Sequence, residues 1–162
     1  MSRHFRAKVY RKNRRTGEYY DCGWVYGDLH HDYNGSYCTM ISNICDIEMT
    51  TKTYDVESTT VGQYTGKDDI TNKNIYEGDV VRMIAKNKSW HSVNGFTGVV
   101  VFDTDLLQYT VVDKSEGDDF AELADKNFSL EVIANIYDKP EWKKAIKPLS
   151  KDVKADTEDL PF

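Results

Sequence analysis

The sequence predicts a mainly-β fold with minor α-helix. Many short segments alternate apolar with polar residues and are rich in Val, Ile, Thr and Tyr, which is the period-two pattern of half-buried strands. Gly, Asn and Asp separate these segments at short intervals, as they do in turns. We expect an N-terminal β meander over residues 1–60 and a small barrel of the SH3-like kind, with a short helix, over residues 61–147. A flexible acidic tail is expected over residues 148–162.

The first half is expected to contain five strands. A basic segment, Arg11 to Arg15, lies between the first two, and Arg15 to Glu18 has the composition of a hairpin turn. A second connection, from Gly27 to the Asn34-Gly35 turn, is expected to be a loop or a hairpin connection. The predicted strands cover residues 4–12, 19–26, 36–41, 44–49 and 50–60.

A central stretch over residues 60–82 organises the second half. Gly62, Gly66 and Gly78 mark points where the chain is expected to turn, and residues 67–74 form a polar segment expected to be a loop. After it, residues 85–96 should be a long hairpin loop and residues 120–126 irregular or a single helical turn. Pro140 predicts the first position of a helix that runs to about Lys147. The predicted strands cover residues 79–84, 97–102, 106–112 and 129–137.

Composition bounds the class of protein. The chain has 162 residues with 40% hydrophobic and 30% charged residues, which suits one domain or two small subdomains. It has no apolar run near the ~20 residues of a membrane span, and its basic start precedes no apolar segment, so we expect no signal peptide. The odd number of cysteines, at irregular spacing, favours reduced thiols and a cytoplasmic location.

The charge is unevenly distributed. The formal net charge is −6, yet residues 1–15 contain seven basic residues and no acid, so the remainder carries −13. A basic arm can bind nucleic acid by releasing counterions from phosphate, which makes Arg11, Lys12, Arg14 and Arg15 candidate contacts. The alternative, which we favour, is a solvated hairpin turn, because groove binders usually spread positive charge over a whole face.

The sequence gives little reason to expect a metal or a cofactor. Several Cys and His residues could be offered as a zinc site, but a structural zinc site normally contains a Cys-x2-4-Cys knuckle, and none occurs. Buried small residues and loop histidines explain them better. We therefore expect neither metal nor cofactor at the set Cys22, His30, His31, Cys38 and Cys45.

No pattern of catalytic residues is present. The paired acids Asp68-Asp69, Asp103 with Asp105, and Asp118-Asp119 fall in predicted turns, where Asp is favoured for local hydrogen bonds. Ser, Cys and His lack the flanking motifs of a nucleophile, and the glycines lack the lysine and helix of a phosphate loop. We expect a protein without enzymatic activity.

The central stretch resembles the signature of the YopX family, small proteins of phages and prophages of Gram-positive bacteria. Val61 to Gly66, followed by Ile75 to Val81, carries the resemblance. Its motif residues are Gly62, Gln63, Tyr64, Gly66, Tyr76, Glu77, Gly78 and Asp79. Three further segments agree in order, namely Phe5-Arg6-Ala7, Gly98 to Asp103 and Glu131 to Tyr137. The resemblance spans roughly residues 3–142, departs at Lys67 and Ala134, and implies a fold and a phage setting without catalytic residues.

The last residues resemble the C-terminal tip of bacterial single-stranded DNA-binding proteins, which combines a linker, several acids and a terminal Leu-Pro-Phe or Ile-Pro-Phe. That resemblance implies docking to replication, recombination and repair proteins. The aromatic anchor, the terminal carboxylate and the stiffening proline suit a docking peptide. A solubilising tail is the alternative. The docking residues would be Asp156, Glu158, Asp159, Leu160, Pro161 and Phe162.

Two functions follow from these patterns. The first is a phage-encoded binding module that oligomerises through its β body, since its 11 tyrosines suit subunit contacts, and docks host replication and repair proteins through its tail. The second is a single-stranded nucleic-acid-binding protein that uses the basic arm and aromatic residues. The acidic body opposes the second, because it repels phosphate. We therefore prefer the first.

Overall fold

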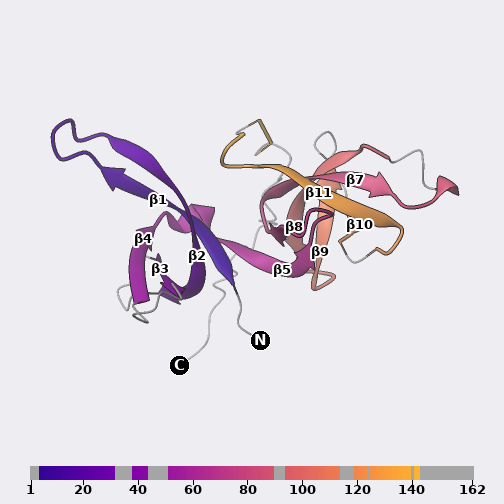
Figure 1. Ribbon diagram of the computed structural model, residues 1–162, viewed down its shortest axis with the longest axis horizontal. Helices are drawn as coiled ribbons and strands as arrows, with labels where there is room; N and C mark the ends of the chain where they lie inside the picture. The colour runs from indigo at the N-terminus through magenta and orange to yellow at the C-terminus, as the bar shows by residue number, and fades with distance from the viewer. Residues whose placement is uncertain are drawn as a thin grey trace, which may run out of the picture.

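In the computed structural model the chain forms two antiparallel β-sheets (Figure 1). One sheet has six strands in the order β4-β3-β2-β1-β5-β6, and the other has five in the order β10-β9-β8-β7-β11. The predicted mainly-β fold is confirmed, while the SH3-like form of the barrel stays a prediction. The structure describes residues 4–31, 38–43, 51–89, 94–113, 119–123, 125–139 and 141–142.

The six-stranded sheet is built on a long hairpin. β1 pairs with β2 on one side and with β5 on the other, and β5 pairs with β6. The sheet therefore continues past residue 60, the boundary expected from the sequence. Its strands are β1 (Phe5–Lys12), β2 (Tyr19–His31), β3 (Cys38–Asn43), β4 (Thr51–Val56), β5 (Gly62–Asp68) and β6 (Asn74–Tyr76), with a 3-10 turn at Ser58–Thr60 before β5.

The five-stranded sheet buries both of its faces. Adjacent valines point to opposite sides of a strand, so Val81 and Val100 join one apolar cluster while Val80 and Val99 join another. This explains why its strands are continuous apolar runs. Its strands are β7 (Asp79–Ala85), β8 (Thr97–Asp103), β9 (Gln108–Asp113), β10 (Asp119–Glu122) and β11 (Phe128–Asn135).

The first hairpin is buried at one end and exposed at the other. Ala7 and Val9 pack with Val56 in a small apolar cluster, whereas every residue from Tyr10 to Cys22 is exposed. In Figure 1 the tip of the β1–β2 hairpin projects away from both sheets. No core therefore covers the basic segment.

Some expected boundaries in the first half are wrong. β2 continues through residues 27–31, where the start of a loop or hairpin connection was predicted, because Asp28 to His31 pair with β3. Gly62 begins β5 and Gly66 lies inside it, where turns were predicted, and the loop begins only after Asp68. Residues 58–60 form a 3-10 turn, so the predicted strand over 50–60 ends early, at Val56. The predicted strand over 44–49 lies outside the described residues.

The second half follows its predicted order more closely. The strands predicted over 79–84, 97–102, 106–112 and 129–137 correspond to β7, β8, β9 and β11. β9 begins at Gln108, because Leu107 has a positive φ of 55° and belongs to the preceding turn. Residues 119–122 form strand β10, paired with β9, in place of the expected irregular segment or helical turn. Most of the helix predicted after Pro140 lies outside the described residues. Among the residues that are described, no helix is long and apolar enough to cross a membrane.

Candidate functional site

A buried ion pair joins the two sheets. Nη2 of Arg6, on β1, lies 2.5 Å from Oδ1 of Asp79, at the start of β7, and the two side chains are only 6% and 1% exposed. The guanidinium carbon also lies 4.8 Å from the ring centroid of Trp24 and 4.7 Å from that of Tyr76. Because both charges are buried, each would be strongly unfavourable without the other. The aromatic rings add cation–π attraction to the guanidinium.

Asp79 also holds the turn that precedes it. Its Oδ2 accepts a hydrogen bond of 2.8 Å from the backbone N–H of Tyr76, and its Oδ1 accepts one of 3.4 Å from the Asn135 side chain. Gly78 occupies the left-handed region with a φ of +82°, which glycine adopts without strain, and its N–H donates to the carbonyl of Val100. The Glu-Gly-Asp turn is thus fixed from β6, β8 and β11.

Gly62 is required by close approach of two backbones. A Cβ atom at this position would lie 2.5 Å from the carbonyl oxygen of Glu77, which is too close for any side chain. The N–H of Glu77 donates to the carbonyl of Gln63 at 3.0 Å, so the turn lies directly against β5. Burial raises the pKa of the Glu77 carboxyl. The Gly62 and Glu77-Gly78-Asp79 parts of the motif therefore meet at one place.

Lys8 forms a second buried link. Its Nζ lies 2.6 Å from Asp21 on β2 and 2.7 Å from Asp138, just after β11. Burial alone would lower the pKa of Lys8, but its hydrogen bonds to Asp138 and Asp21 outweigh burial and raise that pKa above its ordinary value. Lys8 thus ties both strands of the first hairpin to the end of the second sheet.

The loop between β5 and β6 is held by Asp69. One carboxylate oxygen accepts from the backbone and hydroxyl of Thr71 and from the N–H of Lys73, and the other accepts from the N–H of Val132 on β11. These hydrogen bonds outweigh the opposing effect of burial and lower the pKa of Asp69 to about 2. The N–H of Ile70 donates to the carbonyl of Leu130 beside them. This loop is therefore a third connection between the sheets.

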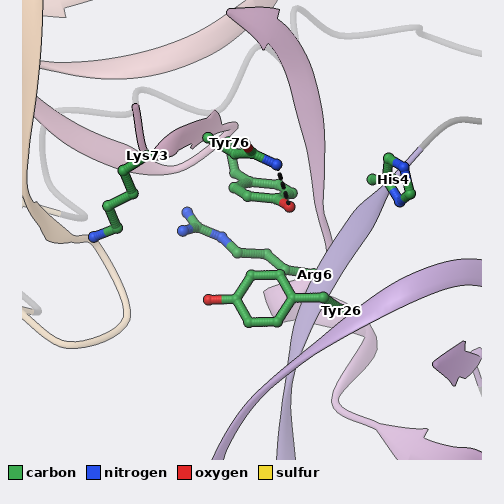
Figure 2. Close-up of a pocket in the computed structure, with 6 residues that line it drawn as sticks. His4, Arg6, Tyr26, Lys73 and Tyr76 are labelled. Carbon is green, nitrogen blue, oxygen red and sulfur yellow. Dashed lines mark hydrogen bonds between the residues drawn. The ribbon is translucent and has the colours of Figure 1, made fainter. Parts of the chain in front are cut away.

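A cavity of about 370 Å³ lies beside the Arg6–Asp79 pair. Figure 2 shows the side chain of Arg6 beside the rings of Tyr26 and Tyr76, with its guanidinium directed toward the side on which Lys73 lies. Among the described residues, no carboxylate lies within ion-pair distance of the Lys73 ammonium. The walls therefore combine two cations with two tyrosines. The cavity is lined by His4, Arg6, Tyr26, Lys73, Asn74 and Tyr76.

The basic residues singled out in the sequence lie together at the tip of the first hairpin. Asn13 closes the turn, because its backbone carbonyl accepts from the N–H of Gly17 and its side-chain oxygen accepts from the backbone N–H of Arg15. Tyr19 and Tyr20 beside them are 70% and 52% exposed. Within the described part of the chain, none of the four cations forms an ion pair with a carboxylate. These cations are Arg11, Lys12, Arg14 and Arg15.

Other predicted site residues are placed as follows. Tyr64 donates from its hydroxyl to Asp68 at 2.8 Å, and its ring lies 5.7 Å from that of Tyr76. Gly66 has a φ of +83°, within a register shift of β5 against β6. The six residues of the proposed docking tail lie outside the described residues, as does Cys45. In the described residues, no group of three or more His, Cys, Asp or Glu could hold a metal ion.

The cavity itself was not predicted from the sequence. Arg6 appeared only within the segment Phe5-Arg6-Ala7, and Lys73 only within a polar loop, so neither was proposed as a binding residue. One signal in the sequence was available: Arg6 is a basic residue in a strand of regular apolar alternation. An arginine that becomes buried in such a strand needs partners. The partners, Asp79 and the rings of Trp24 and Tyr76, come from distant segments that only the fold brings together.

Comparison with known proteins identifies the family of the chain. The family model described as YopX protein matches residues 4–142. The chain belongs to the YopX family. No curated protein matches the chain. In this YopX protein the segments that carry the family resemblance, including Phe5-Arg6-Ala7 and Glu77-Gly78-Asp79, converge on the junction of the two sheets.

Proposed function

We propose that this YopX protein is a non-enzymatic accessory protein of a phage or prophage that acts in the host cytoplasm as a binding module. Its β body would oligomerise or hold a partner. Its Asp-Leu-Pro-Phe tail would dock host proteins that recognise the tip of single-stranded DNA-binding proteins. The observation that carries the proposal is the sequence of the tail, Ala155 to Phe162.

The chemistry of the tail supports docking. Asp156, Glu158 and Asp159 would be attracted to a basic rim, and the ring of Phe162 would fill an apolar pocket. An arginine beside that pocket could pair with the terminal carboxylate. Pro161 restricts the backbone and so reduces the entropy lost on binding. Such a tip needs no enzymatic machinery in the body that carries it.

The acids of the body support a binding role over catalysis. Asp69 and Asp79 are buried, and every acceptor contact described for them holds a turn or a sheet junction. Asp103 accepts from the N–H groups of Asp105 and Leu106 and so shapes the turn after β8. These carboxylates are used structurally, which agrees with the interpretation of the acidic pairs as turn residues.

Direct binding measurements test the tail. A purified host protein that binds the tip of single-stranded DNA-binding proteins is titrated with the intact chain, with a chain ending at Asp159, and with Phe162→Ala. We expect loss of binding for both variants, with unchanged circular dichroism of the body. The matched control is Leu149→Ala, which removes an apolar side chain upstream of the tip and should bind normally. Equal affinity of the truncated and intact chains would refute tail docking.

Single-stranded nucleic-acid binding is a second candidate, supported by the exposed hairpin. Its four cations have no acid partner among the described residues, and Lys12 lies 5.8 Å from the ring centroid of Tyr19. Clustered cations next to exposed aromatic rings suit a strand whose bases stack while its phosphates pair. The net charge of −6 weakens attraction to phosphate over long range, so contact would be local to the hairpin.

A salt series tests the second candidate. Affinity for a single-stranded oligonucleotide should fall with salt, and neutralising three hairpin arginines should reduce the slope of log K against log salt by about 2. The variant is Arg11→Gln with Arg14→Gln and Arg15→Gln. The matched control neutralises three exposed lysines elsewhere, namely Lys86→Gln, Lys88→Gln and Lys126→Gln. Equal slopes in the two triple variants would exclude the hairpin as the contact.

A further inference from the structure

The junction cavity has an excess of positive charge. Arg6 and Lys73 lie on its walls, with His4 at its edge, and Asp79 is the carboxylate that pairs with Arg6. Asp68 lies opposite Asn74 in the strand register, but it accepts from the Tyr64 hydroxyl and does not line the cavity. An excess of cations around a cavity attracts anions, and here it occurs in a chain whose net charge is −6.

Arg6 has hydrogen-bonding capacity that the protein does not use. Asp79 and the carbonyl of Glu77 both accept from the same nitrogen, Nη2. Nε is buried without a partner among the described residues. A guanidinium carries five N–H donors, and leaving a buried donor unpaired is unfavourable. The side chain is 6% exposed, and its guanidinium end is directed into the cavity (Figure 2). Because Nε is itself buried, an anionic group in the cavity would contact the N–H groups at the guanidinium end, beside Asp79.

The remaining walls are suited to a flat ring. Tyr26 lines the cavity and is 49% exposed, and its ring lies 5.7 Å from that of Tyr76. The Asn74 side chain lies beside Tyr76 at 3.5 Å and offers both a donor and an acceptor. The volume of about 370 Å³ lies in the range of small-molecule sites, which is roughly 300 to 1,000 Å³.

We propose that this cavity binds a nucleoside monophosphate, with the phosphate between Arg6 and Lys73 and the base against Tyr26. A phosphate carries up to two negative charges on three oxygens, so it can accept from both cations at once. The base supplies the flat face that an exposed tyrosine stacks on. The same group occurs on a free nucleotide and at the 5′ end of a single strand, and both sources present the chemistry that the cavity would recognise.

Calorimetric titration tests the site on the full chain. The probes are a nucleoside 5′-monophosphate, the matching nucleoside and inorganic phosphate. We expect the monophosphate to bind at least tenfold more tightly than either fragment, because only it contacts both the cations and the tyrosine. Absence of monophosphate binding at millimolar concentration, or equal binding of inorganic phosphate, would overturn the proposal.

Variants locate the binding without disturbing the buried ion pair. Lys73→Gln removes an exposed cation of the cavity and should weaken monophosphate binding about tenfold, as expected for loss of a charge-assisted hydrogen bond. Lys88→Gln removes the same charge from an exposed position that does not line the cavity and should leave the affinity unchanged. Tyr26→Leu should abolish the preference for monophosphate over inorganic phosphate. Equal effects of the two lysine variants would contradict the assignment.

Two variants used above test whether this site is independent of the other proposals. The hairpin triple variant and the chain ending at Asp159 should both bind the monophosphate as the intact chain does, so failure of the hairpin or the tail proposal leaves this one testable.

Competition experiments identify the source of the phosphate. If a 5′-phosphorylated oligonucleotide displaces the monophosphate and the same oligonucleotide without the phosphate does not, the ligand is a strand end. Competition by neither oligonucleotide would identify the free nucleotide.

Discussion

At the residue scale, two glycines and one buried carboxylate explain the part of the family motif that lies at the sheet junction. Gly62 allows β5 to touch the Glu77 carbonyl, Gly78 supplies a left-handed turn, and Asp79 holds that turn while pairing with Arg6. Each residue satisfies a backbone or charge requirement of the sheet junction. The motif is therefore first a structural one, and any binding role comes from the cavity that the junction creates.

Gly62→Ala should destabilise the protein by about 3 kcal/mol, because the added methyl would contact a carbonyl that β5 itself holds in place. Gly95→Ala is the comparison, since Gly95 has a φ of +84° and open space around it, and it should cost only about 1 kcal/mol. Urea unfolding measures both. A Gly62 variant as stable as the Gly95 variant would show that the two backbones can separate freely.

Asp69 should make the free energy of unfolding fall at acidic pH. Its folded pKa of about 2 lies below its ordinary value of 3.8, so its contribution is present above about pH 4 and is lost as pH falls toward 2. Asp69→Asn should cost roughly 2 kcal/mol at neutral pH, because its amide cannot accept at all the positions of the carboxylate. Urea midpoints of both proteins between pH 6 and pH 2 measure this. A constant gap between them down to pH 2 would contradict it.

At the element scale, strands with regular alternation were predictable, and those set by distant partners were not. β1, β7, β8 and β11 were recognised because their own residues alternate or form apolar runs. β2 extends through Gly27 to His31 because β1 and β3 pair with it, which no local pattern indicates. β5 contains two glycines that indicate turns locally, yet pairing with β1 and β6 makes it a strand.

The candidate site was less predictable than the fold. The hairpin cations were identified because they are contiguous in the sequence, and the structure places them together at one tip. The cavity combines His4 and Arg6 from β1 and its start, Tyr26 from β2, and Lys73 from the loop before β6. Only the sheet order β2-β1-β5-β6 brings these segments together, and sequence spacing does not reveal that order.

The Arg6–Asp79 pair should behave as one energetic unit between elements. Arg6→Met and Asp79→Leu should each cost about 3–5 kcal/mol, because each leaves an uncompensated buried charge. The double variant should cost clearly less than the two single costs combined, since neither charge then remains. Urea unfolding of the four proteins gives this cycle. Additive costs would show that the pair is not coupled.

At the scale of the whole molecule, charge and surface are divided among distinct regions. A basic hairpin projects from the first sheet, a cavity with excess positive charge lies at the junction, and the sequence ends in an acidic, apolar-tipped segment. The two sheets are joined by the Arg6–Asp79 pair, by Lys8 and by the Asp69 loop. This arrangement agrees with the proposal of a binding module that presents several surfaces.

The central claim is that the tail docks host replication and repair proteins. The most direct measurement is a pull-down from the lysate of a Gram-positive host, with the intact chain beside a chain ending at Asp159. A synthetic peptide of the last eight residues serves as competitor. The account predicts that replication or repair proteins bind the intact chain, are absent with the truncated chain and are displaced by the peptide. The same proteins on both chains, undisturbed by the peptide, would contradict it.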